Sequence, residues 1–210
     1  METIAGMSEQ FSFPGFEAPV TRAPQVKAPR VERPLHSLFF AMRPAPVDLP
    51  RIEAAASAVR QQHGVERGLV KAERLHVTCC DLGDFNAAPA QTLVDAAVAV
   101  AAVLVRPSFE LVFDRVMRFK GNRALALLAD EGAGEFKAFR AALGRALAQA
   151  GLGVDSGGAP HMTLGYGGDD VSESLAKPIR WTAQDFVLVH SLVGKGEHRH
   201  LGRWPLLPPR

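Results

Sequence analysis

The chain has 210 residues, of which 47% are hydrophobic and 22% are charged, and its formal net charge is +2. This balance is typical of a globular protein with a sizeable core, built as one domain or as two closely packed lobes. The small positive charge permits an anionic substrate, but it argues against a protein that wraps broadly around a nucleic acid.

Cysteine usage and the N-terminal sequence bear on localisation. The two cysteines, Cys79 and Cys80, are adjacent in an expected strand and would point to opposite faces, so we expect no structural disulfide between them. The first ten residues lack the regions of a signal peptide, and the most apolar stretch, 93–105, is short for a membrane span and contains Asp95. We therefore expect a cytoplasmic protein that does not associate with membranes.

Residues 1–34 differ in composition from the rest of the chain. A proline recurs at every fifth position from Pro14 to Pro34, with basic residues between, which forbids a regular helix. We expect a flexible, extended arm; a basic arm that contacts RNA or a partner subunit is the alternative. Residues 35–210 are expected to form the folded domain.

Hydrophobic periodicity divides the folded domain into strands and helices. The expected strands are residues 35–42, 75–82, 108–116, 123–129, 161–166, 185–193 and 198–204. The expected helices are residues 48–62, which Asp48 would cap and Gly64 would end, 89–105, and 135–150. Residues 194–196 would turn the last two strands into a hairpin. This order predicts an α+β protein in which helices pack on mostly antiparallel sheets.

Two of the expected strands carry the same tripeptide, His-x-Thr. It occurs as His76-Val77-Thr78 and as His161-Met162-Thr163, each after a helix that ends in glycine and each with glycine shortly after. Residues two apart on a strand share a face, so each copy places an imidazole beside a hydroxyl. Two such strands could present both pairs to one cleft.

This arrangement suits the cleavage of a phosphodiester. One neutral histidine removes a proton from the attacking oxygen, and one protonated histidine gives a proton to the leaving oxygen. Both forms are accessible near neutral pH because the ordinary histidine pKa is about 6.5. Thr78 and Thr163 would hydrogen-bond the non-bridging phosphate oxygens, where negative charge develops.

With these motifs, the chain resembles the 2H phosphoesterase superfamily, and within it the RNA 2′,3′-cyclic phosphodiesterases, historically called 2′-5′ RNA ligases. The resemblance spans about residues 35–206, because the opening strand 38–42 and the closing hairpin around 188–191 and 201–206 are also similar. It implies a bilobal fold of two pseudo-symmetric lobes, each an antiparallel sheet with helices packed outside. The two histidines would then face each other across a central groove.

The resemblance also implies an activity. It predicts metal-independent hydrolysis of RNA 2′,3′-cyclic phosphate ends to 2′-phosphomonoesters, with weak reverse 2′-5′ ligation and no cofactor. His161 would be the base and His76 the acid, although the sequence does not establish this order. Phe40 and Arg43, on and after the opening strand, are the expected substrate-binding residues together with Tyr166. Tyr166 follows the second motif where many members of the family carry an arginine.

Other interpretations remain open from the sequence. The same chemistry could act on another small cyclic phosphate or on a 2′-5′ oligonucleotide, or the chain could be a binding module for RNA ends without turnover. His198 and His200 share a strand face but lack further ligands at metal-binding spacing, so we expect them on a solvated hairpin. Arg115, Arg118 and Arg123 are further candidates for contacting RNA phosphates. The sequence does not indicate the oligomeric state.

Overall fold

The structure of the chain is a computed structural model that describes residues 34–130 and 133–208. The expected arm, residues 1–34, lies outside the described residues except for Pro34.

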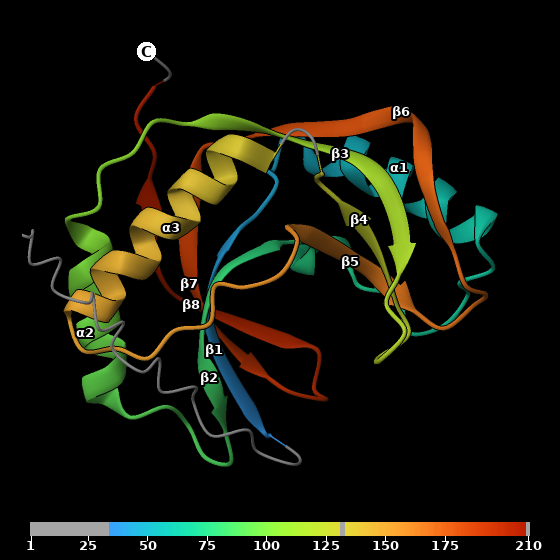
Figure 1. Cartoon of the computed structure of the whole chain (residues 1–210). Helices are drawn as coiled ribbons and strands as arrows, with labels where there is room; N and C mark the ends of the chain where they lie inside the picture. The colour runs from blue at the N-terminus through green and yellow to red at the C-terminus, as the bar shows by residue number, and fades with distance from the viewer. Residues whose placement is uncertain (1–33, 131–132, 209–210) are drawn as a thin grey trace, which may run out of the picture.

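Eight strands form two four-stranded antiparallel sheets (Figure 1). The first sheet has the order β2-β1-β7-β8 and the second the order β5-β4-β3-β6. The strands of the first sheet are β1 (His36–Met42), β2 (Val77–Phe85), β7 (Asp185–Leu192) and β8 (Glu197–Pro205). Those of the second are β3 (Phe109–Arg118), β4 (Ala124–Leu128), β5 (His161–Tyr166) and β6 (Ser172–Ala183). The predicted α+β class with two antiparallel lobes is confirmed.

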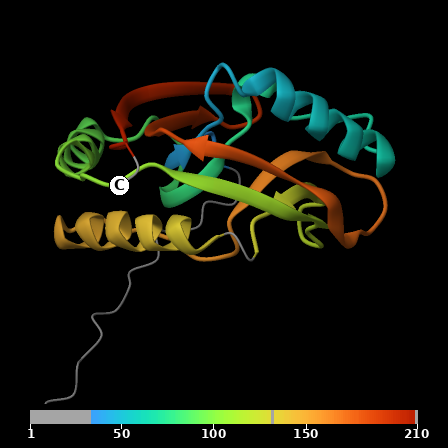
Figure 2. The ribbon, with the colours of Figure 1, turned by 90° about the horizontal axis from the view of Figure 1, so that it is seen from above.

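Three α-helices cover the outer faces of the sheets, on opposite sides of the strands (Figure 2). They are α1 (Leu49–Gln62), α2 (Gln91–Ala102) and α3 (Gly134–Gln149), and a short 3-10 helix η1 (Ala72–Arg74) precedes β2. In α3, the ring of Phe139 lies 5.1 Å from that of Phe186 on β7, so this helix packs on the first sheet. In α1, Arg51 donates a 2.8 Å hydrogen bond to the carbonyl of Arg180 on β6, so α1 packs on the second sheet.

Two helices each pack on the sheet to which their neighbouring strands do not belong, and this arrangement brings the two His-x-Thr strands together. α1 lies between β1 and β2 in the chain but packs on the other sheet, and α3 does the same between β4 and β5. β2 and β5 are each an edge strand, and these two edges contact each other. Asp81 of β2 and Asp155 exchange backbone hydrogen bonds of 2.7 and 2.9 Å, which fixes the junction between the sheets.

One strand was not predicted. β6 has Pro178 in its interior and many exposed side chains, both of which are unfavourable signals for a central strand. The proline is tolerated because β6 is an edge strand, and because its pairing with β3 shifts register between Phe113 and Arg115, opposite the segment that contains Pro178.

Two further expectations concern the helices. α1 has nearly the predicted bounds, but Asp48 does not cap it with its side chain; instead the carboxylate accepts a 2.9 Å hydrogen bond from Arg51. In the part of the chain that the structure describes, no helix is both long and apolar enough to cross a membrane.

Candidate active site

His76 and His161 are held in the same way, each through its Nδ1 atom. His76 Nδ1 lies 2.7 Å from the carbonyl oxygen of Arg74, and His161 Nδ1 lies 2.9 Å from that of Ala159. In both cases the acceptor is the residue two positions earlier. Because a carbonyl oxygen can only accept, Nδ1 carries the proton in both rings. Nε2 is therefore the atom that remains for proton transfer at each histidine.

A phenylalanine ring packs against each of these imidazoles. Phe39 of β1 stacks on His76 with ring centroids 5.2 Å apart, and Phe119, just after β3, meets His161 edge-on at 4.9 Å. β4 runs between Phe119 and His161. Its Ala124 and Ala126 lie on the same face as these two rings, and their small side chains leave room for the rings to meet across the strand. The two rings restrict the orientations of the imidazoles, which favours a preorganised site.

The threonines lie on the same strand faces as the histidines, opposite small residues. Thr78 pairs with Ala41 on β1, and Thr163 pairs with Ala126 on β4. Both threonines are partly exposed, while Val77 and Met162 between the motif residues are fully buried in the core. The alternation predicted for the His-x-Thr tripeptides is therefore present in both strands.

The environment of His76 keeps it neutral. Burial, together with the positive charges of Arg74 and Arg43, lowers the pKa of His76 to about 4. At neutral pH, its Nε2 thus carries no proton and can accept one. His76 directly precedes β2 and His161 begins β5, the two edge strands that contact each other at the junction of the sheets.

The prediction that Phe40 binds substrate is wrong. Its side chain is 0% exposed and packs in the core, with the rings of Phe186 and Trp204 at 6.0 and 5.9 Å. Its neighbour Phe39 occupies the site instead, because the regular alternation of β1 places Phe39 and Ala41 on the face opposite Leu38, Phe40 and Met42. On the groove side, Phe39 forms a small cluster with Ala41, Val187 and Val189.

Tyr166 is on the same strand face as His161 and Thr163, although an even strand would place it on the other. The pairing of β5 with β4 skips Leu164, so Tyr166 pairs with Ala124 in register with Thr163 and Ala126. Its side chain is 48% exposed, so the ring is available to a ligand.

The basic residues of the sequence divide into paired and unpaired groups. Arg118 is 4% exposed, and its guanidinium donates to backbone carbonyls, including that of Asp169, so it is not available to RNA. Arg123 is paired with Asp170, and Arg115 with Asp130. Within residues 34–130 and 133–208, Arg43 has no carboxylate partner; it lies 3.2 Å from Nε2 of His200.

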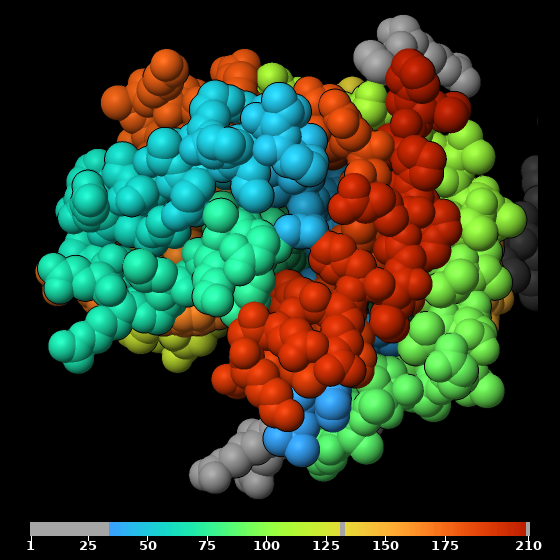
Figure 3. All heavy atoms as spheres, turned by 180° about the vertical axis from the view of Figure 1, so that it is seen from behind, coloured from blue at the N-terminus to red at the C-terminus, as the bar shows by residue number. Residues whose placement is uncertain are grey.

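His198 belongs to the site, contrary to the expectation of a solvated hairpin. Its ring lies 5.3 Å from that of His76 and 5.8 Å from that of Phe39, and Arg74 approaches its Nε2 at 3.3 Å. The hairpin of β7 and β8, red in Figure 3, thus lies beside the chain that leads from α1 into β2. No signal in the sequence separates His198 from a surface histidine, because its neighbours come from β1 and η1. Among the described residues, no three His, Cys, Asp or Glu side chains are grouped so as to hold a metal ion.

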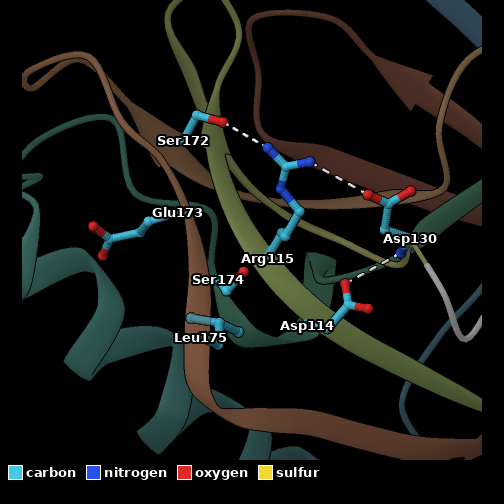
Figure 4. Close-up of a pocket in the computed structure, with 7 residues that line it drawn as sticks. All are labelled: Asp114, Arg115, Asp130, Ser172, Glu173, Ser174 and Leu175. Carbon is cyan, nitrogen blue, oxygen red and sulfur yellow. Dashed lines mark hydrogen bonds and ion pairs between the residues drawn. The ribbon is translucent and has the colours of Figure 1, made fainter.

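A hollow lies on the face of the second sheet that carries His161. Arg115 lies in the same cross-strand row as Leu128 and His161, and it lines a hollow of about 440 Å³ with six other residues (Figure 4). Its guanidinium donates to Ser172 at 2.8 Å and to Asp130 at 3.3 Å. The hollow therefore presents hydroxyl and carboxylate oxygens beside a cation that is already partnered.

The fold defines the class of protein. The chain is similar to the crystal structure of E. coli LigT complexed with 3′-AMP, with a TM-score of 0.64 and 21% identity over 83% of this chain and 99% of that one. A structure described as a phosphoesterase matches with a TM-score of 0.65 and 23% identity over 82% and 99% of the two chains. A protein of Thermus thermophilus matches with a TM-score of 0.64 and 20% identity over 83% and 100%. The chain thus has a LigT-like fold.

The family model of the 2′-5′ RNA ligase superfamily matches residues 48–194, a span that includes both His-x-Thr motifs. The chain belongs to this superfamily, as its resemblance to the 2H phosphoesterases predicted. A comparison with curated protein sequences finds no significant match.

Proposed function

We propose that this protein hydrolyses the 2′,3′-cyclic phosphate at RNA ends to a 2′-phosphomonoester, without a metal ion. The observation that carries the proposal is the matched anchoring of His76 and His161. Both donate Nδ1–H to a backbone carbonyl, both lie at the junction of the two sheets, and both keep Nε2 for proton transfer. A binding site alone would not require two imidazoles fixed in the same tautomer.

In the proposed reaction, the substrate phosphate lies between the two Nε2 atoms. His161 takes a proton from a water molecule as its oxygen attacks phosphorus, and the bond from phosphorus to O3′ breaks. His76 gives a proton to O3′, so the products are a 3′-hydroxyl and a 2′-phosphomonoester. Return of the proton from His161 to His76 through solvent restores the starting state.

We take the order of acid and base from the family resemblance; the exposure of His161 favours it, whereas the low pKa of His76 fits it only once the phosphate is bound. The attacking group is water, and the hydrogen bond that anchors His161 is exposed, whereas that of His76 is partly buried among arginines. An acid must hold a proton, and the pKa of His76, about 4 in the empty site, is too low for that at neutral pH. The negative charge of the bound phosphate would raise this pKa, so His76 takes up its proton together with the substrate.

Other residues have supporting roles in the proposal. Thr78 and Thr163 donate hydrogen bonds to the non-bridging phosphate oxygens and stabilise the charge that develops there. Tyr166, exposed beside the second motif, is placed to stack on a base or to contact the phosphate. Arg43 attracts the anionic substrate to the first sheet. By microscopic reversibility, the same histidines would also catalyse 2′-5′ ligation of RNA ends.

The competing functions differ in their substrates or in the absence of turnover. The LigT structures were solved with 3′-AMP, ATP, NADP⁺ and phosphate, which supports a nucleotide ligand but does not separate RNA from smaller cyclic phosphates. The experiment is a turnover assay with four substrates. They are RNA with a 2′,3′-cyclic phosphate end, a nucleoside 2′,3′-cyclic phosphate, an ADP-ribose cyclic phosphate and a 2′-5′ oligonucleotide.

The proposal predicts the highest kcat/KM on the RNA end, a 2′-phosphate product, and loss of activity in His161→Ala. Faster turnover of one of the other three substrates would identify that substrate class instead. Binding of RNA ends without turnover of any substrate would make the chain a binding module.

A further inference from the structure

A cluster of arginine and histidine side chains lies next to His76. It consists of Arg43, Arg74, His198 and His200, contributed by the chain after β1, by η1 and by β8. His198 and His200 are two residues apart and pair with Ser191 and Val189 of β7, so both lie on the face of the sheet that carries Phe39. The reaction proposed above assigns no role to the two histidines.

Within the cluster, each arginine contacts an imidazole rather than a carboxylate, and Arg43 also donates through Nη2 to the backbone carbonyl of Glu73. Arg74 Nη2 lies 3.3 Å from His198 Nε2, and Arg43 Nη1 lies 3.2 Å from His200 Nε2. A neutral imidazole nitrogen accepts from a guanidinium without neutralising its charge. The pairs therefore orient two positive charges without neutralising them, although Asp185 and Glu73 act on Arg43 from a distance.

The electrostatics of the cluster agree with this description. Burial and the neighbouring His76, Arg74 and Arg43 lower the pKa of His198 to about 3, and burial and Arg43 lower the pKa of His200. Both imidazoles are thus neutral acceptors at physiological pH. Of the nearby acids, Asp185 is paired with Arg203 at 3.3 Å, and Glu73 is exposed.

Both guanidiniums also retain an unused donor. The Nε atoms of Arg43 and Arg74 are buried and have no hydrogen-bond partner. A buried donor without a partner is costly unless a ligand satisfies it. Guanidinium groups are suited to phosphate, because their fork of N–H donors matches two phosphate oxygens.

We propose that Arg43 and Arg74, held by His200 and His198, bind a second phosphate: the one on the 5′ side of the nucleotide whose cyclic phosphate is cleaved. This inference rests on the proposed function, because it takes the first phosphate to lie between His76 and His161. It predicts that the substrate is a nucleotide chain with phosphates on both sides of the terminal ribose. A nucleoside cyclic phosphate would fill only half of the site.

The test is calorimetric binding of product analogues, which needs no turnover. The ligands are adenosine 2′-monophosphate, adenosine 2′,5′-bisphosphate, and a dinucleotide that ends in a 2′-phosphate. The wild-type protein is expected to bind both two-phosphate ligands about 10-fold more tightly than the monophosphate, a difference of about 1.4 kcal/mol. A gain for the dinucleotide assigns the subsite to an RNA phosphodiester. A gain for the bisphosphate alone assigns it to the 5′-phosphate of a free nucleotide.

Arg74→Gln and Arg43→Gln should each reduce the gain in affinity of the two-phosphate ligands over the monophosphate to less than threefold. The Arg74 substitution keeps the backbone carbonyl that holds His76. The matched control is Arg199→Gln, which removes the same charge from β8 but faces the other side of the sheet, pairs with His190 and binds Glu197 at 2.6 Å. It should retain the full gain.

Equal affinities of wild type for the three ligands, or an undiminished gain in both variants, would overturn the subsite. An intact gain in a protein that turns over no cyclic phosphate would instead overturn the proposed reaction and leave the subsite standing. Thermal unfolding of each variant checks that the fold is unchanged.

Discussion

Lowering the pH from 7.5 to 5 should destabilise the wild-type protein more than a His76→Asn variant. The folded protein keeps His76 neutral, because burial and neighbouring positive charges lower its pKa to about 4. In the unfolded chain, the same group takes up a proton near pH 6.5. As the pH falls through 6.5, the unfolded state therefore binds a proton that the folded state does not, and the free energy of unfolding decreases until the pH reaches about 4.

The size of the effect follows from these two pKa values. A group that titrates at about 6.5 in the unfolded chain and at about 4 in the folded protein costs about 2 kcal/mol of stability between pH 7.5 and pH 5. Urea denaturation at both pH values measures the free energy of unfolding, and the wild-type loss should exceed that of His76→Asn by about this amount. His198 contributes in the same direction, since burial, His76 and the neighbouring arginines lower its pKa to about 3; the part of this shift that His76 causes is lost in His76→Asn and adds to the difference between the two proteins.

An NMR titration of the imidazole signals gives the pKa of His76 directly. In the empty protein it should lie well below the ordinary value, and saturating inorganic phosphate should raise it, because the bound anion stabilises the protonated ring. A His76 pKa between 6 and 7 in the empty protein, or equal pH dependence of the two proteins in urea, would refute this reasoning.

Three further predictions concern activity and packing. His76→Ala and His161→Ala should each lower kcat on RNA cyclic phosphate ends by roughly 10²- to 10⁴-fold. Thr78→Ala and Thr163→Ala should lower it less, because each removes one hydrogen bond to the phosphate; near-full activity of both histidine variants would contradict the mechanism. Hydrolysis should persist after exhaustive chelation, whereas loss in EDTA with rescue by a divalent ion would point to a metal-assisted reaction. Phe40→Ala should lower the free energy of unfolding by about 3–5 kcal/mol, since it empties a core position; a loss below about 1 kcal/mol would argue against the buried placement of this ring.

Local patterns in the sequence were enough to predict much of the fold. Helical spacing of apolar residues located α3, and the glycine-bounded strand around His161 has the predicted limits. The His-x-Thr tripeptides show period-two alternation, so their partly exposed histidines and threonines flank core residues as expected. These features depend on neighbours within a few residues in the chain, which a single sequence contains.

Features that depend on register or on distant neighbours were not predictable. Phe39, not Phe40, faces the site because β1 alternates regularly, and since residues 38–42 are all apolar, the sequence does not indicate which face of β1 lies in the core. His198 enters the site only because its hairpin packs against η1, more than 120 residues away in the chain. β6 was not predicted because it contains Pro178, which an edge strand tolerates but a central strand would not.

The most direct test of the two-histidine mechanism compares two leaving groups in the two histidine variants. The substrates are a 2′,3′-cyclic phosphate, whose alcohol needs a proton to leave, and 3′-deoxyadenosine 2′-(4-nitrophenyl phosphate), whose nitrophenolate does not. If His76 is the acid, His76→Ala should lose roughly 10²- to 10⁴-fold in kcat/KM on the cyclic phosphate but stay within about tenfold of wild type on the nitrophenyl ester. His161→Ala should lose activity on both, because water still requires a base. The opposite pattern would reverse the assignment of acid and base. If His76→Ala loses as much activity on the nitrophenyl ester as on the cyclic phosphate, and His161→Ala does the same, proton transfer is not divided between His76 and His161.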